Sequence, residues 1–202
     1  MTHNRCWSYI LAIVGFFALS AAAGAQTSVG VSVYGAFSGT TTANNVQQSP
    51  SNSAGGIIEL RHISNPILGY EATYSYNRAN QSYRCTTNSC PVISPVTVPA
   101  NAHQVTVDWV PSIHVAPLRP FGVLGIGLLL NQPTGNTANT TTSTKAVYVY
   151  GAGLDWGVLP HLGLRFQYRG NLYKSPDLTK LYTSVDRFRN TSEPMIGAYL
   201  SF

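Results

Sequence analysis

The strongest constraint on the fold is an alternation of apolar with polar or small side chains that recurs along the 202 residues of the chain. It is clearest in the segment LGLRFQYRGNLY, where Leu162, Leu164, Phe166 and Tyr168 alternate with Gly163, Arg165, Gln167 and Arg169. A period of two places successive side chains on opposite faces of a β-strand. The segment therefore predicts a strand with one apolar face and one face that carries charge.

Seven further segments of similar length show the same pattern, and the sequence after the N-terminal segment shows no convincing helical period. They are SVGVSVYGAF, GGIIELRHIS, LGYEATYSYN, HQVTVDWVP, FGVLGIGLLLN, AVYVYGAGLDWG and SEPMIGAYLSF. An even number of strands is typical of closed bacterial barrels. We therefore predict an all-β fold, an eight-stranded antiparallel up-and-down transmembrane β-barrel.

The connections between these segments alternate between short and long. Short turns are predicted around Asn65–Pro66, from Ala116 to Arg119, and around Leu159–Pro160–His161. The other connections are long and polar, and contain TTTANNVQQSPSNS, RANQSYRCTTNSCPVISPVTVPAN, QPTGNTANTTTST and KSPDLTKLYTSVDRFRN. Outer-membrane barrels have this layout, with short periplasmic turns and long outer loops.

Charge is confined to one face of the predicted strands. That face carries Glu59, Arg61, Glu71, Asp108, Asp155, Arg165 and Arg169. The other face is apolar, with Tyr and Trp near the strand ends as in aromatic girdles, and His62 is its main polar residue. Because a soluble antiparallel sandwich has its charge outside, the pattern favours a barrel with the charged face inside. The alternative is a soluble exported sandwich or a lipocalin-like barrel.

The first 25 residues predict a secretory signal peptide. Arg5 precedes the apolar run CWSYILAIVGFFALS, and Ala23 and Ala25 provide the small residues of a cleavage site. The alternative is an uncleaved N-terminal anchor, although small residues and not charges follow the run. The predicted organisation is a signal peptide over 1–25 and a barrel domain over 26–202.

Export also favours a disulfide between Cys85 and Cys90, the cysteines that remain once Cys6 is removed with the signal peptide. The bond would close a small loop within one of the long connections. Metal binding would need further soft ligands, which the neighbouring sequence lacks. We predict no cofactor and no metal.

The signal peptide, the eight alternating segments and the final residues MIGAYLSF make the chain resemble the small outer-membrane β-barrels of the OmpA/OmpX type. Gly197, Leu200 and Phe202 have the spacing of that family's assembly signal, with Met195 where a polar residue is usual. The resemblance implies a location in the bacterial outer membrane, contact with its lipids, and recognition of Phe202 by the barrel-assembly machinery. We expect a monomer.

Side chains just fill the interior of an eight-stranded barrel. The predicted hairpins place Arg61 across from Glu71 and Asp155 near Arg165. With Asp108 and Arg169, these residues predict a locked lumen charge network and a structural or surface-interaction role for the long loops. The alternative is a narrow channel for small solutes or ions, with Gly125, Gly127, Gly151 and Gly153 leaving room. Only 9 % of residues are charged and no Lys/Arg run is present, which argues against nucleic-acid binding.

A second alternative is a lipid-modifying enzyme. The segment RHISN holds His62 and Ser64 on one face and resembles the His-x-Ser-Asn motif of lipid A deacylase barrels, where His and Ser act as base and nucleophile. The predicted topology places this motif beside a periplasmic turn, away from outer-leaflet lipid A, and points Glu71 inward. We therefore predict an interfacial histidine beside a turn and no enzymatic activity.

Overall fold

The computed structural model describes residues 26–87, 94–135 and 139–202. Within these ranges, one sheet contains ten strands. They are β1 (Gln26–Ser38), β2 (Thr41–Ala43), β3 (Val46–Pro50), β4 (Ser53–Ile63), β5 (Gly69–Cys85), β6 (Val96–Trp109), β7 (Leu118–Pro133), β8 (Ser143–Leu159), β9 (Leu162–Lys174) and β10 (Phe188–Ser201). The signal peptide predicted over 1–25 lies outside the described residues and remains a prediction.

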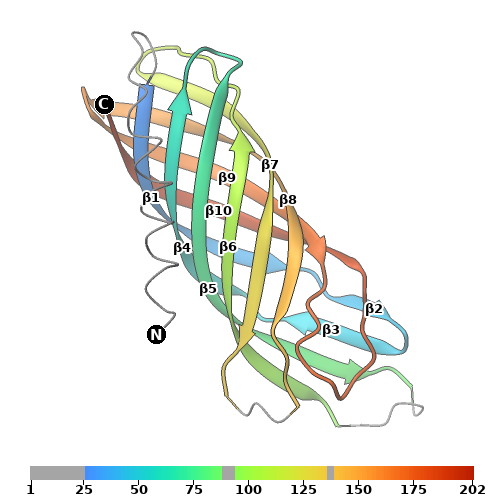
Figure 1. Ribbon diagram of the computed structural model, residues 1–202. Helices are drawn as coiled ribbons and strands as arrows, with labels where there is room; N and C mark the ends of the chain where they lie inside the picture. The colour runs from blue at the N-terminus through green and yellow to red at the C-terminus, as the bar shows by residue number, and fades with distance from the viewer. Residues whose placement is uncertain (1–25, 88–93, 136–138) are drawn as a thin grey trace, which may run out of the picture.

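The eight long strands form a closed barrel. β1 closes it, because it pairs antiparallel with both β4 and β10. Every other long strand pairs antiparallel with its neighbours along the chain, from β4–β5 to β9–β10. Figure 1 shows the C-terminus and the short turns at one end of the barrel, with β2 and β3 at the other. The predicted eight-stranded up-and-down barrel is confirmed.

The two faces of the barrel wall are divided as the alternation predicts. On β7, Leu124, Ile126 and Leu128 point outward and are more than half exposed, whereas Val123 and Leu129 are buried inside. The arginines of β4 and β9 that share the inward face are buried as well. The wall therefore has an apolar outer surface around an interior that holds all of the buried charge in the described ranges together with apolar clusters. Among the described residues, no helix is long and apolar enough to span a membrane.

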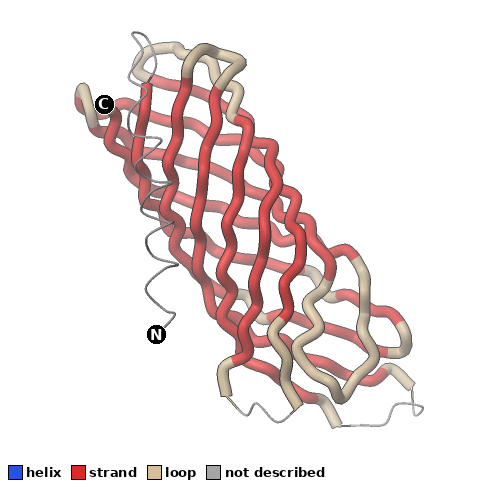
Figure 2. Tube along the Cα trace, in the orientation of Figure 1, coloured by secondary structure: helices blue, strands red, loops and turns tan. Residues whose placement is uncertain are grey.

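The strands extend well beyond the lengths that the sequence predicted. β5 continues to Cys85 and β6 begins at Val96, so most of the predicted loop between them is sheet. In the same way β7 reaches Pro133 and β10 begins at Phe188, which shortens two more predicted loops. Strand pairing continues because it satisfies backbone hydrogen bonds beyond the roughly ten residues that a membrane crossing needs. Figure 2 shows strands along almost the whole length of the molecule.

The first predicted loop is a hairpin. β2 pairs with β3 around Asn44 and Asn45, whose φ angles are +51° and +60°. Two successive residues at positive φ are the mark of a type I′ turn, in which asparagine is favoured. β3 also pairs with β5, and β5 with β6. Strands β2, β3, β5 and β6 therefore form a sheet that continues past the barrel, which we call the outer extension.

The outer extension has an apolar core of its own, which we call the cap. Its residues are Val46, Tyr83, Val98, Ala100, Leu178, Tyr182 and Val185. The last three come from the segment between β9 and β10, which the sequence predicted to be a polar loop. Gln48 and Tyr83 hold this segment in place, since each donates a hydrogen bond to the carbonyl of Pro176, over 3.0 and 2.8 Å. The segment thus packs against the sheet.

Candidate functional site: the filled lumen and the outer extension

The charged residues of the lumen form one cluster of ion pairs. Arg61 donates through Nε to Glu71 Oε2 over 2.6 Å and through an Nη to Asp155 Oδ2 over 3.0 Å. Arg165 binds Asp155 with two nitrogens, at 2.7 and 3.0 Å, and Glu59 Oε2 with a third at 2.8 Å. The hairpin pairings place Arg61 opposite Glu71 and Asp155 opposite Arg165, as the sequence predicts.

Glu71 lies at the centre of this cluster. Besides Arg61, its carboxylate lies 3.4 Å from the guanidinium nitrogens of both Arg165 and Arg169. Arg169 also pairs with Asp108 at 3.0 Å and donates to Thr106 Oγ1 over 3.1 Å. All six predicted lumen residues, together with Glu59, are therefore brought together. We call these seven residues the charge network.

The charge network fills its part of the lumen. Arg61 and Arg169 are 0 % exposed and Arg165 is 1 % exposed. The ring of Phe121 packs against Arg61, with the guanidinium carbon 4.0 Å from the ring centroid. Two of the lumen glycines allow this packing, because a Cβ at Gly125 would collide with the Asp108 carboxylate and one at Gly153 with the Phe121 ring. Their space is therefore occupied by side chains.

Three charged residues of the interior escaped the sequence analysis. Arg119, which was assigned to a turn, lies in β7 opposite Asp155 and is partly buried. Glu193 and Arg189, on β10, are 7 % and 2 % exposed. A simple signal would have found them, since Glu193 and Arg189 continue the inward period of two that includes Met195 and Gly197. The same step from Phe121 reaches Arg119.

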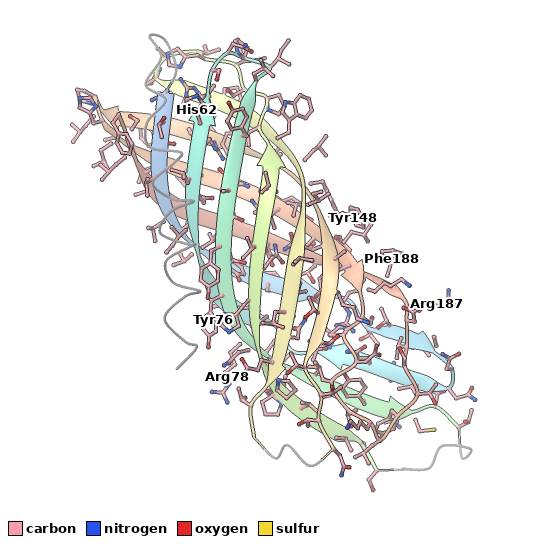
Figure 3. All side chains as sticks on the ribbon, viewed as in Figure 1. His62, Tyr76, Arg78, Tyr148, Arg187 and Phe188 are labelled. Carbon is pink, nitrogen blue, oxygen red and sulfur yellow. The ribbon has the colours of Figure 1, made fainter. Side chains whose placement is uncertain are left out.

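The candidate catalytic motif is not assembled. His62 Nδ1 lies 2.9 Å from Thr27 Oγ1, and the ring stacks on Tyr70 with centroids 5.5 Å apart. Ser64 lies in the turn, where its backbone N–H donates to the carbonyl of Leu68 over 2.8 Å. Within the described ranges, no hydrogen bond joins the His62 and Ser64 side chains, and Glu71 is turned into the lumen. Figure 3 shows His62 at the barrel end where β10 finishes.

Cys85 and Phe202, two further residues singled out by the sequence, lie at strand ends. Cys85 ends β5, and its predicted partner Cys90 lies outside the described residues, so the disulfide remains a prediction. Phe202 follows β10, and its backbone exchanges two hydrogen bonds with Thr27 of β1, at 2.9 and 3.2 Å. In the described part of the chain, no group of three or more His, Cys, Asp or Glu side chains could hold a metal ion.

The outer end of the molecule, made up of the outer extension, the adjoining ends of β8 and β9 and the segment between β9 and β10, has a basic surface. Its exposed or partly exposed charged residues are Arg78, Arg84, Lys145, Lys174, Lys180, Arg187, Asp177 and Asp186. Asp177 pairs with Lys145 at 3.1 Å and Asp186 with Lys174 at 3.0 Å. The other four cations form no ion pair with a described residue. Figure 3 shows Arg78 and Arg187 far from His62, toward the outer extension.

A closed eight-stranded barrel with an apolar outer surface, paired charges inside and long extensions at one end defines the class of small outer-membrane barrels. The sequence matches the model of the outer membrane protein beta-barrel domain family over residues 9–191, and the chain belongs to this family. It is therefore a bacterial outer-membrane protein, and its apolar outer surface contacts lipid.

Three solved structures show a similar fold. Ail, the attachment invasion locus protein of Yersinia pestis, in complex with the heparin analogue sucrose octasulfate, has 16 % identity and a TM-score of 0.51, over 88 % of this chain and 99 % of that one. Neisserial surface protein A has 13 % identity and a TM-score of 0.53, over 89 % and 98 %. OprG from Pseudomonas aeruginosa has 9 % identity and a TM-score of 0.53, over 89 % and 96 %. No curated protein sequence matches.

Proposed function

We propose that this protein is a surface-interaction barrel that binds an anionic partner at its outer extension and has a lumen closed to solutes. The observation that carries the proposal is the contrast between the two sets of charges. Those of the charge network are buried and paired, whereas Arg78, Arg84, Lys180 and Arg187 are exposed and form no ion pair with a described residue. Exposed cations that lack acidic neighbours attract anions and speed their association.

A polysulfated saccharide is the appropriate first probe. Ail was solved in complex with sucrose octasulfate, a heparin analogue. That complex belongs to Ail, and it supports the choice of probe for a protein of the same fold with a basic outer end. We expect the purified barrel in zwitterionic detergent to bind heparin and to bind its desulfated form much more weakly. Affinity should fall as salt rises, because exposed charges are screened.

Two matched double variants test which cations bind. Arg78→Gln with Arg187→Gln removes two cations without an ion-pair partner, whereas Lys145→Gln with Lys174→Gln removes two that pair with aspartates. We expect the first pair to weaken heparin binding by about tenfold, which corresponds to about 1.4 kcal/mol. The second should have a smaller effect, because each of these ammonium groups is already neutralised by an aspartate and contributes little to heparin binding. Equal losses, or no heparin binding by the unmodified protein, would contradict the proposal.

The narrow channel is the alternative that conductance measurements address. A water-filled pore would leave lumen side chains accessible, yet the three arginines of the charge network are at most 1 % exposed. We therefore expect no steady conductance in planar bilayers. A reproducible conductance that changes in the Arg165→Ala variant would favour the channel instead.

The enzyme alternative predicts a change in lipid A. His62 is engaged by Thr27 and lies at the short-turn end, which faces the periplasm in this family. We therefore propose that the protein has no deacylase activity. Mass spectra of lipid A should be the same with and without expression, and loss of an acyl chain that depends on Ser64 would overturn this.

We further propose that Phe202 is the assembly signal and that the barrel is a monomer. Closure of β1 against β10 places Phe202 beside the first strand, at the last pair of the barrel seam. Deletion of Phe202 should lower the amount of protein in the outer membrane while leaving export intact. Normal outer-membrane levels would remove this role, and a dimer in detergent by light scattering would contradict the monomer.

A further inference from the structure

Between the charge network and the cap, the lumen contains a small polar chamber of about 40 Å³. Its polar lining includes Tyr34, Ser75, Gln81, Gln104, Asn131, Tyr173, Thr191 and Glu193. Ser51, Ser53 and Asn77 also line it, and these are exposed or partly exposed where β3 gives way to β4. The chamber therefore has a mostly buried lining and a more exposed side at the β3–β4 junction, in the outer half of the molecule.

Glu193 is the unusual residue of this chamber. The four other buried carboxylates, Glu59, Glu71, Asp108 and Asp155, each lie within 3.0 Å of an arginine nitrogen. Glu193 is 7 % exposed and forms no ion pair with any described residue; the Asn171 side chain interacts with its carboxylate, and the Arg169 guanidinium acts on it from beyond ion-pair distance. A buried carboxylate without a cationic partner is costly, so it either takes up a proton or holds a cation.

The remaining lining groups are suited to a cation. Tyr34, Ser75 and Thr191 provide hydroxyl oxygens, and Gln104 and Asn131 provide amide oxygens. Asn131 is 5 % exposed, and its Nδ2 has no hydrogen-bond partner, so the chamber holds a buried polar group that protein contacts leave unsatisfied. Because an amide can be turned over, Asn131 can present its oxygen to the chamber.

Charge and size narrow the class of cation. The chamber offers one carboxylate and several neutral oxygens, whereas Ca²⁺ sites usually collect several carboxylates. Its volume of about 40 Å³ exceeds the roughly 10–15 Å³ that a cavity needs to hold one water molecule, so a small ion fits. We propose that the chamber binds one small monovalent cation, Na⁺, K⁺ or NH₄⁺, on the Glu193 carboxylate. The ion links β10 to β1, β5, β6 and β7, which contribute the other oxygens.

Thermal unfolding in matched salts tests this site. The full-length mature barrel in zwitterionic detergent is compared in NaCl, KCl, NH₄Cl and choline chloride at equal ionic strength and pH. Because choline is too large for the chamber, the unfolding temperature should rise with at least one small cation and stay unchanged with choline. A ligand that binds only the folded state stabilises it by mass action. The same unfolding temperature in all four salts would overturn the proposal.

Two variants test whether Glu193 causes the difference in unfolding temperature between the salts. Glu193→Gln should lose the difference between small cations and choline, and it should be at least as stable as the native protein in choline, because it removes a buried unpaired charge. Asp177→Asn, the matched control, removes a carboxylate from the surface and should keep the difference. A Glu193→Gln variant that retains the cation response would overturn the proposal.

A direct measurement on the unmodified protein does not depend on the variant folding. Titration of the stabilising chloride salt into protein kept in choline chloride should give calorimetric heats that saturate at one cation per barrel. Heats that do not saturate, or that saturate equally in the unfolded protein, would show that the Glu193 carboxylate holds no cation.

Discussion

The charge network and the cap are two interior clusters of one sheet, and they are built from opposite kinds of residue. The charge network is held by Arg–carboxylate pairs, whereas the cap is held by Val, Leu and Tyr. β5 takes part in both. In the barrel it points Glu71 and Ser75 inward and Tyr74 outward, and in the outer extension it points Tyr83 inward and Arg84 outward.

The difference shows which solvent surrounds each part. Lipid surrounds the barrel, so its apolar side chains face outward and its polar groups must be paired inside. Water surrounds the outer extension, so the ordinary arrangement of a soluble sheet returns, with apolar residues inside. The strand keeps its register throughout, and only the polarity of the two faces is exchanged between Tyr76 and Ser82. This exchange marks the level at which the sheet leaves the membrane.

Removal of the central carboxylate should cause the largest effect. Glu71→Ala leaves three buried arginines with one carboxylate fewer, and removal of one partner of a buried ion pair typically costs about 3–5 kcal/mol. Urea unfolding in detergent or lipid should show this loss in the global transition. Thr73→Ala, on the same strand and face, is the control. A change below about 1 kcal/mol for Glu71→Ala would mean that the network contributes little to stability.

The next largest difference in stability should be between two variants that place a lysine on either side of the polarity exchange. Ile126→Lys places an ammonium on the lipid-facing surface and should destabilise the barrel by about 2–4 kcal/mol. Ser82→Lys places the same group on the outward face of the outer extension and should change stability by less than about 0.5 kcal/mol. Similar unfolding free energies for the two variants would show that the membrane boundary does not lie between Tyr76 and Ser82.

The cap should unfold locally, without unfolding of the barrel. Leu178 is 0 % exposed, and Leu178→Ala should cost about 2 kcal/mol, the lower end of the range for a buried leucine, because a surface segment can partly collapse into the space. The loss should appear as faster amide hydrogen exchange in residues 175–187, with the barrel amides unchanged. Faster exchange throughout β9 and β10 would instead show that cap and barrel unfold as one unit.

The surface ion pair should have the smallest effect. The Lys174 ammonium donates a hydrogen bond to Asp186 and lowers the pKa of that carboxyl, so Lys174→Gln should raise the pKa toward its ordinary value. A carboxyl whose pKa is lower in the folded protein stabilises the folded state at pH values above its unfolded-state pKa. This contribution disappears as the pH falls through the folded-state pKa. NMR titration of the Asp186 carboxyl measures the shift. An unchanged pKa in Lys174→Gln would show that the pair does not persist in solution.

The sequence predicts the barrel well because strands that alternate apolar and polar residues can cross a membrane only as a closed barrel. It predicts Arg61 opposite Glu71 because a tight hairpin fixes register. Arg119 was within reach of the same rule and was missed because the predicted strand began only at Phe121, whereas Glu193 lies within the predicted last strand and was left out of its inward face. The position of Leu178 could not be derived, since an aperiodic segment packs on residues far away in the chain. The chamber around Glu193 depends on the curvature of the whole barrel, which no local pattern encodes.

The charge network also determines how the barrel can be assembled. Arg61 binds Asp155, which lies 94 residues further along the chain, and Arg169 binds Glu71 across a separation of 98 residues. The β4–β5 and β8–β9 hairpins already pair Arg61 with Glu71 and Arg165 with Asp155. A partly formed sheet would nevertheless present the groups that pair across distant strands, such as Asp108 and Arg169, to the lipid without a partner. We therefore expect insertion one hairpin at a time to be disfavoured for this chain, and the charges to enter the membrane together as the two edges of the sheet meet.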